Sequence, residues 1–527
     1  MTRLAEWTML SHGWRRFLLM LVLGAIAATS APPLFILPAL FVTFPFWVWA
    51  LDGAERKRGL GLVFGPAFRI GFAFGWGYFT VSFHWLGAAF FVEGGWFLAL
   101  MPVAILALAA LIAFFWGLAS ALAHALWSHG AWRIVTLAIC LSAADYARGT
   151  FFSGFPFDLL GYALTANVEM MQLSAYVGIY GLTLLAALLA FTPALIWPAD
   201  GRGLVARLVP FFLAVAVIAA QIGYGNYRLA STTLDPAPGL KVRLVQPIIT
   251  EHSNWTTANP PEIVSRLIEV TGDLTGIDLV VWPESVFPFF LSTYPEGLAR
   301  LARMLPPETT LLTGAPREPE FDADSPDNPG YNSVLVIDTN GEIVASYDKS
   351  HLVPFGEYLP LAEFWKLFGI TQFVPGTNGW APGDGRRLVS PPDLPAFIAL
   401  ICYEAIFSGD LGADPEKAEY LLNISNDEWF DGSIGPAKHA HHALLRAVET
   451  GLPLLRGTNS GVTFAADPMG RTIARLAPYE PARLDLELPG RIPPPPFARY
   501  GNLPFLIVLG FGFVLAVATR TRKPRRA

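Results

Sequence analysis

The chain has 527 residues, of which 53% are hydrophobic and only 15% are charged, and its formal net charge is −6. So much apolar sequence excludes a disordered chain, and a soluble globular domain usually has about 25% charged residues. The acidic balance argues against a nucleic-acid partner, which would require a basic face. Two cysteines, Cys140 and Cys402, are too few for a disulfide scaffold. The composition therefore predicts a membrane protein that carries a soluble domain.

Apolar stretches of the chain are predicted to span a membrane, because each approaches the length that crosses a hydrocarbon core. The predicted spans are Phe17–Ser30, Pro33–Leu51, Leu60–Phe90, Phe97–Trp127, Ile134–Ala147, Met171–Trp197, Leu208–Gly223 and Leu503–Thr519. This pattern predicts a membrane domain over residues 1–224 and a soluble domain over residues 225–497. A last span with a basic tail follows over residues 498–527.

Lysine and arginine clusters orient the predicted spans. They precede the first span at Arg15 and Arg16, follow the second at 56–58, and close the chain after the last. If the spans alternate in direction, these clusters share one side, and positive charge marks the cytoplasmic side. Both termini are therefore predicted to be cytoplasmic and the soluble domain to lie outside. Asp145 and Arg148, near the outer end of the fifth span, could contact lipid headgroups or simply snorkel, and snorkelling is the preferred prediction.

Between about Lys241 and Leu488, short apolar runs alternate with helical patterns, which predicts an α/β or α+β layered domain. The turn residues at Asp338–Glu342 predict a hairpin, so the sheet is expected to be mixed. Predicted strands are 242–246, 278–282, 310–313, 333–337, 343–347, 396–401 and 420–424, and predicted helices are 261–274, 296–305 and 439–449.

Reactive side chains follow some of the predicted strands. Pro283 stops one strand and leaves Glu284 beside apolar and aromatic neighbours, where a carboxylate suits the role of general base. Lys349 follows another strand, where its ammonium could stabilise an oxyanion, and Glu357 lies in the same loop. Cys402 ends a third strand, and an unpaired thiol in an oxidising compartment is costly unless its reactivity is used.

Taken singly, a strand-end glutamate, a loop lysine and a buried cysteine are each commonplace. Taken together, they predict acyl transfer: the carboxylate takes the thiol proton, the thiolate attacks a carbonyl, and the ammonium steadies the tetrahedral oxygen. The product of this first step is a covalent thioester.

The segments Trp282–Glu284, Lys349–Tyr358 and Ile401–Glu404 resemble, in that order, the Glu–Lys–Cys triad of the nitrilase superfamily. With predicted spans on both sides, essentially the whole chain resembles the apolipoprotein N-acyltransferase family. The flanking segments that narrow the resemblance are Asn423–Phe430, Arg446–Thr450 and Arg456–Gly461.

This resemblance implies a polytopic membrane domain of about eight helices in the bacterial inner membrane, with an αββα nitrilase-like domain on its periplasmic face. It implies transfer of an acyl chain from a phospholipid, such as phosphatidylethanolamine, to the α-amino group of a diacylglyceryl-cysteine in an apolipoprotein. No cofactor is implied, and the chain is expected to act as a monomer.

The resemblance also implies roles for individual residues. Glu284 matches the general base, Lys349 the oxyanion stabiliser and Cys402 the nucleophile. The supporting positions that match the family pattern are Glu357, Tyr403, Glu404 and Trp255. The chain departs from the commonest pattern outside the triad, at Phe157, Asp431 and Lys438.

Other readings of the sequence stay open. A membrane-tethered amidase or nitrilase would use the same triad with water as acceptor, and it would need a narrow polar pocket. A transporter or lipid-binding scaffold would carry the outer domain as an inactive recognition module. His439, His441 and His442 lack a cysteine or carboxylate at ligand spacing, so no metal site is predicted.

Overall fold

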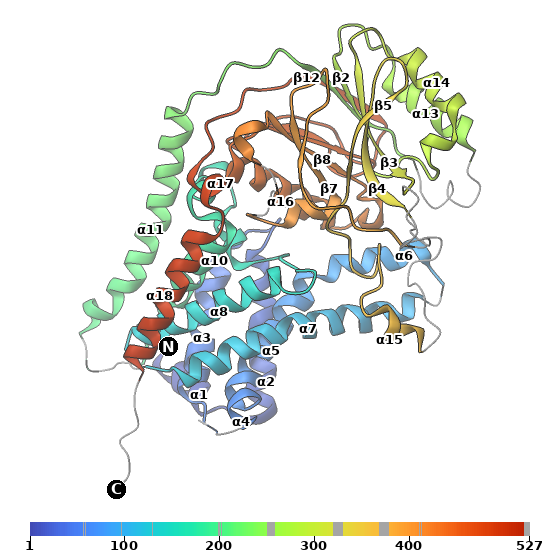
Figure 1. The fold of residues 1–527 in the computed structure, drawn as a ribbon. Coiled ribbons are helices and arrows are strands. Elements are labelled where there is room, and N and C mark those ends of the chain that lie inside the picture. The colour runs from blue at the N-terminus through green and yellow to red at the C-terminus, as the bar shows by residue number, and fades with distance from the viewer. Residues whose placement is uncertain are drawn as a thin grey trace. The chain divides into compact units, whose positions relative to one another are not determined.

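A computed structural model describes residues 1–520, except 56, 58–59, 96, 129, 199–200, 202, 250–258, 320–329, 368–378, 410–411 and 413. The chain divides into two compact units. A helical unit comprises Met1–Ser231 and Tyr500–Ala527, and a sandwich unit comprises Thr232–Arg499 (Figure 1).

The helical unit is built around long apolar helices. Its helices are α1 (Thr2–Leu10), α2 (Gly13–Ala27), α3 (Pro38–Asp52), α4 (Leu60–Val63), α5 (Pro66–Ser82), α6 (Ala89–Glu93), α7 (Phe97–Ala125), α8 (Trp132–Thr150), α9 (Val168–Met171), α10 (Ser174–Phe191), α11 (Leu204–Ser231) and α18 (Leu503–Thr519). The short helix α17 (Pro496–Tyr500) precedes α18, which packs against α8 and α10 although hundreds of residues separate them in the chain.

Within the described residues, four helical segments are long and apolar enough to cross a membrane: Gly13–Ser30, Leu98–Ala125, Ser174–Leu195 and Leu204–Ser231. Helices α3 and α18 are apolar but shorter. The predicted span Leu60–Phe90 is not one helix, because Gly65 adopts an extended conformation before Pro66. Proline disfavours a helical residue before it and suits the first position of a new helix, which explains the break.

The snorkelling prediction for Asp145 and Arg148 is wrong. Both side chains are fully buried on α8, and Arg148 Nε donates to Asp145 Oδ1 at 2.7 Å. Arg148 Nη1 also donates to the carbonyl oxygens of Phe155 and Phe157, at 2.7 and 3.0 Å. Trp116 Nε1 donates to the same Asp145 oxygen at 2.8 Å. The pair therefore holds the chain that follows α8 inside the helical unit.

In the described part of the sandwich unit, twelve strands form two six-stranded sheets in the orders β12-β1-β2-β3-β4-β5 and β11-β10-β9-β8-β7-β6. The strands are β1 (Lys241–Gln246), β2 (Leu279–Val281), β3 (Thr310–Arg317), β4 (Tyr331–Ile337), β5 (Ile343–Asp348), β6 (Leu388–Val389), β7 (Phe397–Ile401), β8 (Tyr420–Ser425), β9 (Leu454–Thr458), β10 (Phe464–Ala466), β11 (Thr472–Arg475) and β12 (Ala482–Glu487).

The two sheets share one design. Each has a parallel trio at its centre, β1-β2-β3 in one and β7-β8-β9 in the other, with antiparallel strands outside. The predicted hairpin is present, since β4 and β5 pair antiparallel around Gly341, whose φ of 79° suits glycine in the turn. The mixed sheet predicted from the sequence is therefore confirmed.

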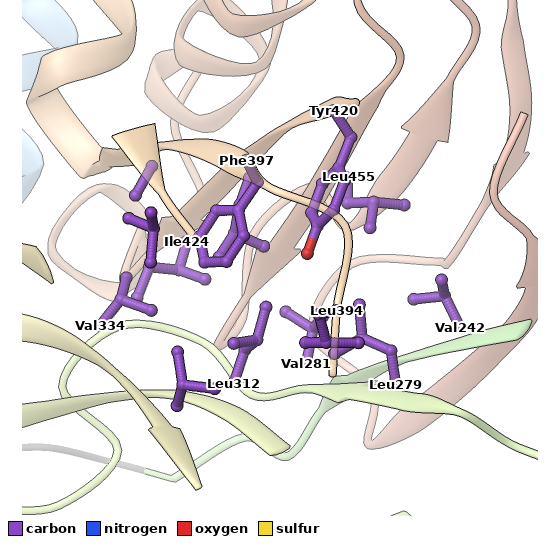
Figure 2. Close-up of a cluster of buried hydrophobic side chains, with 14 of the residues drawn as sticks. Val242, Leu279, Val281, Leu312, Val334, Leu394, Phe397, Tyr420, Ile424 and Leu455 are labelled. Carbon is purple, nitrogen blue, oxygen red and sulfur yellow. The ribbon is translucent and has the colours of Figure 1, made fainter. Parts of the chain in front are cut away.

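The core of the sandwich lies between the two sheets (Figure 2). Strand alternation produces it: Leu279 and Val281 of β2 enter this core, whereas Val280 faces the opposite side of the sheet. On the second sheet, Phe397 and Ile424 pack into the same core.

Helices cover the outer faces of both sheets. Helices α13 (Pro260–Thr271) and α14 (Pro295–Met304) cover the first, through residues such as Leu267 and Leu301. Helix α16 (Gly435–Thr450) covers the second, through residues such as Ala443 and Ala447. The layers therefore run helix, sheet, sheet, helix, and the αββα expectation for this unit is confirmed.

Candidate active site

Glu284 lies just beyond the end of β2 and is almost completely buried. The chain leaves the sheet at Pro283 and passes so close to β3 that a Cβ at Gly314 would collide with the backbone of Pro283 and Glu284. Glycine at 314 is therefore required for this approach. The backbone N–H of Asn426, directly after β8 of the other sheet, donates to Glu284 Oε2 at 2.8 Å. One carboxylate is thus held by both sheets.

Lys349 directly follows β5, and its ammonium is fully buried between two carboxylates. Its Nζ lies 3.2 Å from Glu284 Oε1 and 2.8 Å from Glu357 Oε1. Asn332 Nδ2 donates to the same two oxygens, at 2.8 and 3.0 Å. The other oxygen of Glu357 accepts the N–H of Val353 at 2.7 Å. Glu284, Lys349, Glu357 and Asn332 therefore form one hydrogen-bonded cluster.

Cys402 begins the short 3₁₀ helix η6 (Cys402–Ile406) at the end of β7. Its φ of 48° places a non-glycine residue in the left-handed region, a conformation that persists only where the surroundings impose it. The residue is half-buried and its thiol is free. The turn therefore presents the sulfur at the carboxyl end of a parallel strand, where α/β sheets commonly place their ligands.

Glu404 anchors this turn to the loop that carries Lys349. One carboxylate oxygen accepts the N–H of Ile401 at 2.8 Å, just before the cysteine. The other accepts the N–H of Ser350 at 2.9 Å and the hydroxyl of Tyr347 at 2.9 Å. Tyr403 is buried and its ring packs edge-on against Phe407. Glu404 thus fixes the spacing between the cysteine turn and the lysine loop.

A second set of contacts that holds the Cys402 turn was not predicted from the sequence. His439 Nε2 lies 2.8 Å from the Cys402 carbonyl oxygen, and His439 Nδ1 lies 2.9 Å from Asp427 Oδ1. Arg456 donates to the other oxygen of Asp427 at 2.7 Å. Since His439 holds the backbone of the strained cysteine, its position on α16 has an explanation without a metal. Among the described residues, no three His, Cys, Asp or Glu side chains converge as metal ligands do.

The charges around the thiol act in opposite directions. Burial and the negative charge of Glu284 raise the pKa of Cys402, and Lys349 only partly offsets them. Burial would lower the pKa of Lys349, but the charges of Glu284 and Glu357 outweigh it and raise the pKa well above its ordinary value. The resting site therefore holds a neutral thiol beside a charged ammonium, so a thiolate forms only if a base takes the proton.

Burial would raise the pKa of Asp427, but Arg456 and His439 outweigh it and hold that pKa below its ordinary value. Asp427 therefore stays an anion, which fixes the orientation of His439 behind the cysteine turn.

Six of the seven predicted site residues fall within the described chain. Glu284, Lys349 and Glu357 are joined by hydrogen bonds, and the charges of the first two act on Cys402. Tyr403 and Glu404 lie in the cysteine turn. Trp255 lies outside the described residues, so its role stays a prediction. Asn332 was missed because a single asparagine early in a strand gives no signal in one sequence.

The sandwich fold, with Glu284 and Lys349 joined and their charges acting on Cys402, defines a class of protein: a domain of the carbon–nitrogen hydrolase type. The sequence pattern of the Carbon-nitrogen hydrolase family matches residues 241–488. The pattern of the Apolipoprotein N-acyltransferase N-terminal domain matches residues 23–192.

Relatives match nearly the whole chain. An apolipoprotein N-acyltransferase from Rhodopseudomonas palustris is 36% identical and covers 99% of this chain and 98% of its own length. One from Agrobacterium fabrum is 38% identical over 93% of each chain. A solved amidase of the nitrilase superfamily from Nesterenkonia covers 51% of this chain and 97% of its own, at 17% identity and a TM-score of 0.35. The chain belongs to the apolipoprotein N-acyltransferase family.

Proposed function

We propose that the protein transfers a fatty acyl chain from a phospholipid to the N-terminal α-amino group of diacylglyceryl-cysteine in apolipoproteins, through a thioester on Cys402. Family membership supports the reaction. The observation that carries the residue assignment is the buried Lys349 ammonium, bonded to Glu284 and Glu357, whose charge acts on the Cys402 thiol together with that of Glu284.

In the first half-reaction Glu284 accepts the proton of the Cys402 thiol as the sulfur attacks the ester carbonyl of the phospholipid. The tetrahedral oxygen carries the negative charge, and the Lys349 ammonium stabilises it. When the C–O bond of the ester breaks, Glu284 returns the proton to the departing alkoxide. The products are a lysophospholipid and an acyl thioester on Cys402.

In the second half-reaction the α-amine of the apolipoprotein attacks the thioester carbonyl. Glu284 accepts a proton from the attacking nitrogen and gives it to the sulfur as the C–S bond breaks. An amide forms and the free thiol is regenerated. The two substrates use the site in turn, so the mechanism is ping-pong.

Glu357 has a separate role in this scheme. Because it bonds Lys349 at 2.8 Å, it keeps the ammonium charged and positioned when Glu284 is neutralised by the thiol proton. Asn332 bridges both carboxylates and holds their spacing. Glu404 and Tyr403 position the cysteine turn, and Trp255 is proposed to act in substrate binding.

The same proposal includes the placement of the chain. Both substrates carry acyl chains that water does not deliver, which accounts for apolar helices in the same chain as a catalytic domain. We infer about eight spans in a bacterial inner membrane, a membrane domain over 1–224, and a periplasmic catalytic domain over 225–497. The last span and basic tail would occupy 498–527, with both termini cytoplasmic and the chain a monomer.

A matched pair of cysteine variants tests the function. With phosphatidylethanolamine and a diacylglyceryl peptide, Cys402→Ala should lower N-acylation by more than about 10³-fold, because the nucleophile is lost. Cys140→Ala removes the buried thiol of α8 and should leave the rate within about 2-fold. Full activity in Cys402→Ala would contradict the proposal. Release of free fatty acid without peptide acylation by the wild type would favour a hydrolase instead.

A further inference from the structure

A cavity in the helical unit is formed entirely by residues far in sequence from the candidate active site. It measures about 890 Å³ and lies where the end of α1, the first turns of α2 and α5, and the segment after α3 meet. Its walls close tightly on one side, because a Cβ at Gly53 would collide with the backbone of Met9. Its size falls in the range of small-molecule pockets.

The charged groups that line this cavity are unbalanced. Arg16, Lys57 and Arg69 face a single carboxylate, Glu55. Lys57 already pairs with Glu55 at 2.7 Å, and both of these side chains are exposed. Neither Arg16 nor Arg69 hydrogen-bonds to any residue that the structure describes. Within the described part of the chain, both guanidinium groups therefore keep donors for an anion, and the charge of Glu55 acts on Arg16.

The backbone adds to the positive potential. Helix α2 begins at Gly13 and α5 begins at Pro66, and both residues line the cavity. Neither helix start receives a side-chain cap from the described residues. Arg16 and Arg69 are each the fourth residue of their helix, where acidic residues are normally favoured. Arginines at two such positions oppose the helix dipoles unless an anion lies between them.

An apolar ridge leads away from the cavity along α2. Trp14, one of the lining residues, is 71% exposed, and Leu18, Val22 and Ile26 follow at four-residue spacing with about half of each side chain exposed. The ridge is about 18 Å long, close to the depth of one leaflet of a ~30 Å hydrocarbon core. A ligand with a phosphate at one end and acyl chains at the other fits both features at once.

We propose that this cavity binds the phosphate headgroup of an anionic phospholipid, with its acyl chains along the ridge of Trp14, Leu18, Val22 and Ile26. Basic pockets between membrane helices are suited to such headgroups. A zwitterionic lipid would bring its own ammonium toward Arg16 and Arg69, so an anionic headgroup is preferred. The ridge favours a lipid over a free phosphate compound, which would leave the apolar surface unused.

Native mass spectrometry of the full-length protein in detergent, with phosphatidylglycerol and phosphatidylethanolamine added in equal amounts, tests the site. The wild type should retain phosphatidylglycerol preferentially. The double variant Arg16→Gln/Arg69→Gln should lose about 25-fold in affinity, at about 5-fold for each arginine. Arg3→Gln/Arg520→Gln removes the same charge from α1 and from the residue after α18, outside the cavity lining, and should bind as the wild type does.

Equal retention of the two lipids by the wild type would overturn the proposal, and that measurement needs no variant to fold. An equal loss of phosphatidylglycerol affinity in both double variants would mean that overall charge, not this cavity, binds the lipid. That result would also overturn the proposal. Displacement of the bound lipid by millimolar inorganic phosphate would identify a free phosphate as the occupant and contradict the lipid assignment. Retained N-acylation in Arg16→Gln/Arg69→Gln separates this site from the reaction at Cys402.

Discussion

Two buried charge clusters, one in each unit, show how similar residues serve different ends. In the helical unit, Arg148 pairs with one carboxylate, Asp145, and also donates to the backbone oxygens of Phe155 and Phe157. In the sandwich unit, Lys349 meets two carboxylates, and the charges act on a half-buried thiol. A balanced pair fixes a chain segment, whereas an excess carboxylate beside a thiol provides a group that can accept its proton.

The largest expected effect comes from changing Glu284, and it distinguishes a general base from a purely structural residue. Glu284→Gln keeps an oxygen that can accept the N–H of Asn426 but cannot take a proton, so N-acylation should fall about 10²–10⁴-fold. Steady-state acylation of a diacylglyceryl peptide measures this. Glu296→Gln, on the exposed first turn of α14, is the control and should retain activity. A rate near that of the wild type in Glu284→Gln would remove Glu284 from the role of base.

Lys349→Met should lose activity and also stability. Removing the ammonium leaves Glu284 and Glu357 facing each other without a cation, and breaking a buried pair in this way costs about 3–5 kcal/mol. The thermal unfolding midpoint should drop and should recover partly in Lys349→Met/Glu357→Gln, because one buried charge is removed. Activity should not recover in the double variant, since the oxyanion still lacks its cation. Restored activity would contradict the role of Lys349.

Arg148→Met should lower stability without changing the chemistry of the remaining folded enzyme. The variant leaves the buried Asp145 carboxylate without its cation. It also removes the hydrogen bonds to the carbonyl oxygens of Phe155 and Phe157. Thermal unfolding should occur earlier, and Arg148→Met/Asp145→Asn should recover part of the loss. The rate of N-acylation per folded molecule, normalised to thiol labelling of Cys402, should stay within about 3-fold. A larger fall would mean that this pair also serves the reaction.

The smallest expected effect concerns pH. Burial raises the pKa of Asp431 to about 6, and its Oδ1 accepts the Ser460 hydroxyl at 2.9 Å. Because the folded pKa exceeds the unfolded one, folding favours the protonated form, and stability falls as the pH rises from about 4 to 6. Asp431→Asn should therefore raise the unfolding midpoint at pH 7.5 by about 1–3 °C, and not at pH 4. An equal shift at both pH values would contradict this assignment.

Much of the sandwich could be predicted because its central strands are continuous apolar runs. The strands β1, β7 and β8 coincide closely with predicted ones, and Glu284, Lys349 and Cys402 lie at strand ends. Strand β9 was missed because Arg456 and Gly457 interrupt its apolar pattern. Strand β12 was missed because it is not a continuous apolar run, although its alternation of apolar and polar residues is itself a strand pattern. The predicted strand ends therefore agree with the positions of Glu284 and Cys402 in the structure.

What the sequence did not reveal depends on contacts between distant segments. His439 reaches the Cys402 carbonyl from α16, and Asn332 joins two carboxylates from β4. Neither has a local pattern that marks it. The burial of Arg148 follows from the packing of α7, α8 and the chain after α8. The local sequence does not show this packing, so it favours snorkelling instead.

The most direct test of the central claim is intact-protein mass spectrometry after incubation with phosphatidylethanolamine alone, without an acceptor peptide. We predict a mass increase of one fatty acyl chain, located by peptide mapping on Cys402 and removed by hydroxylamine. The increase should vanish on adding the diacylglyceryl peptide, as the acyl chain moves to its amine. An active enzyme with no acyl chain on Cys402, or with the chain on another residue, would contradict the account.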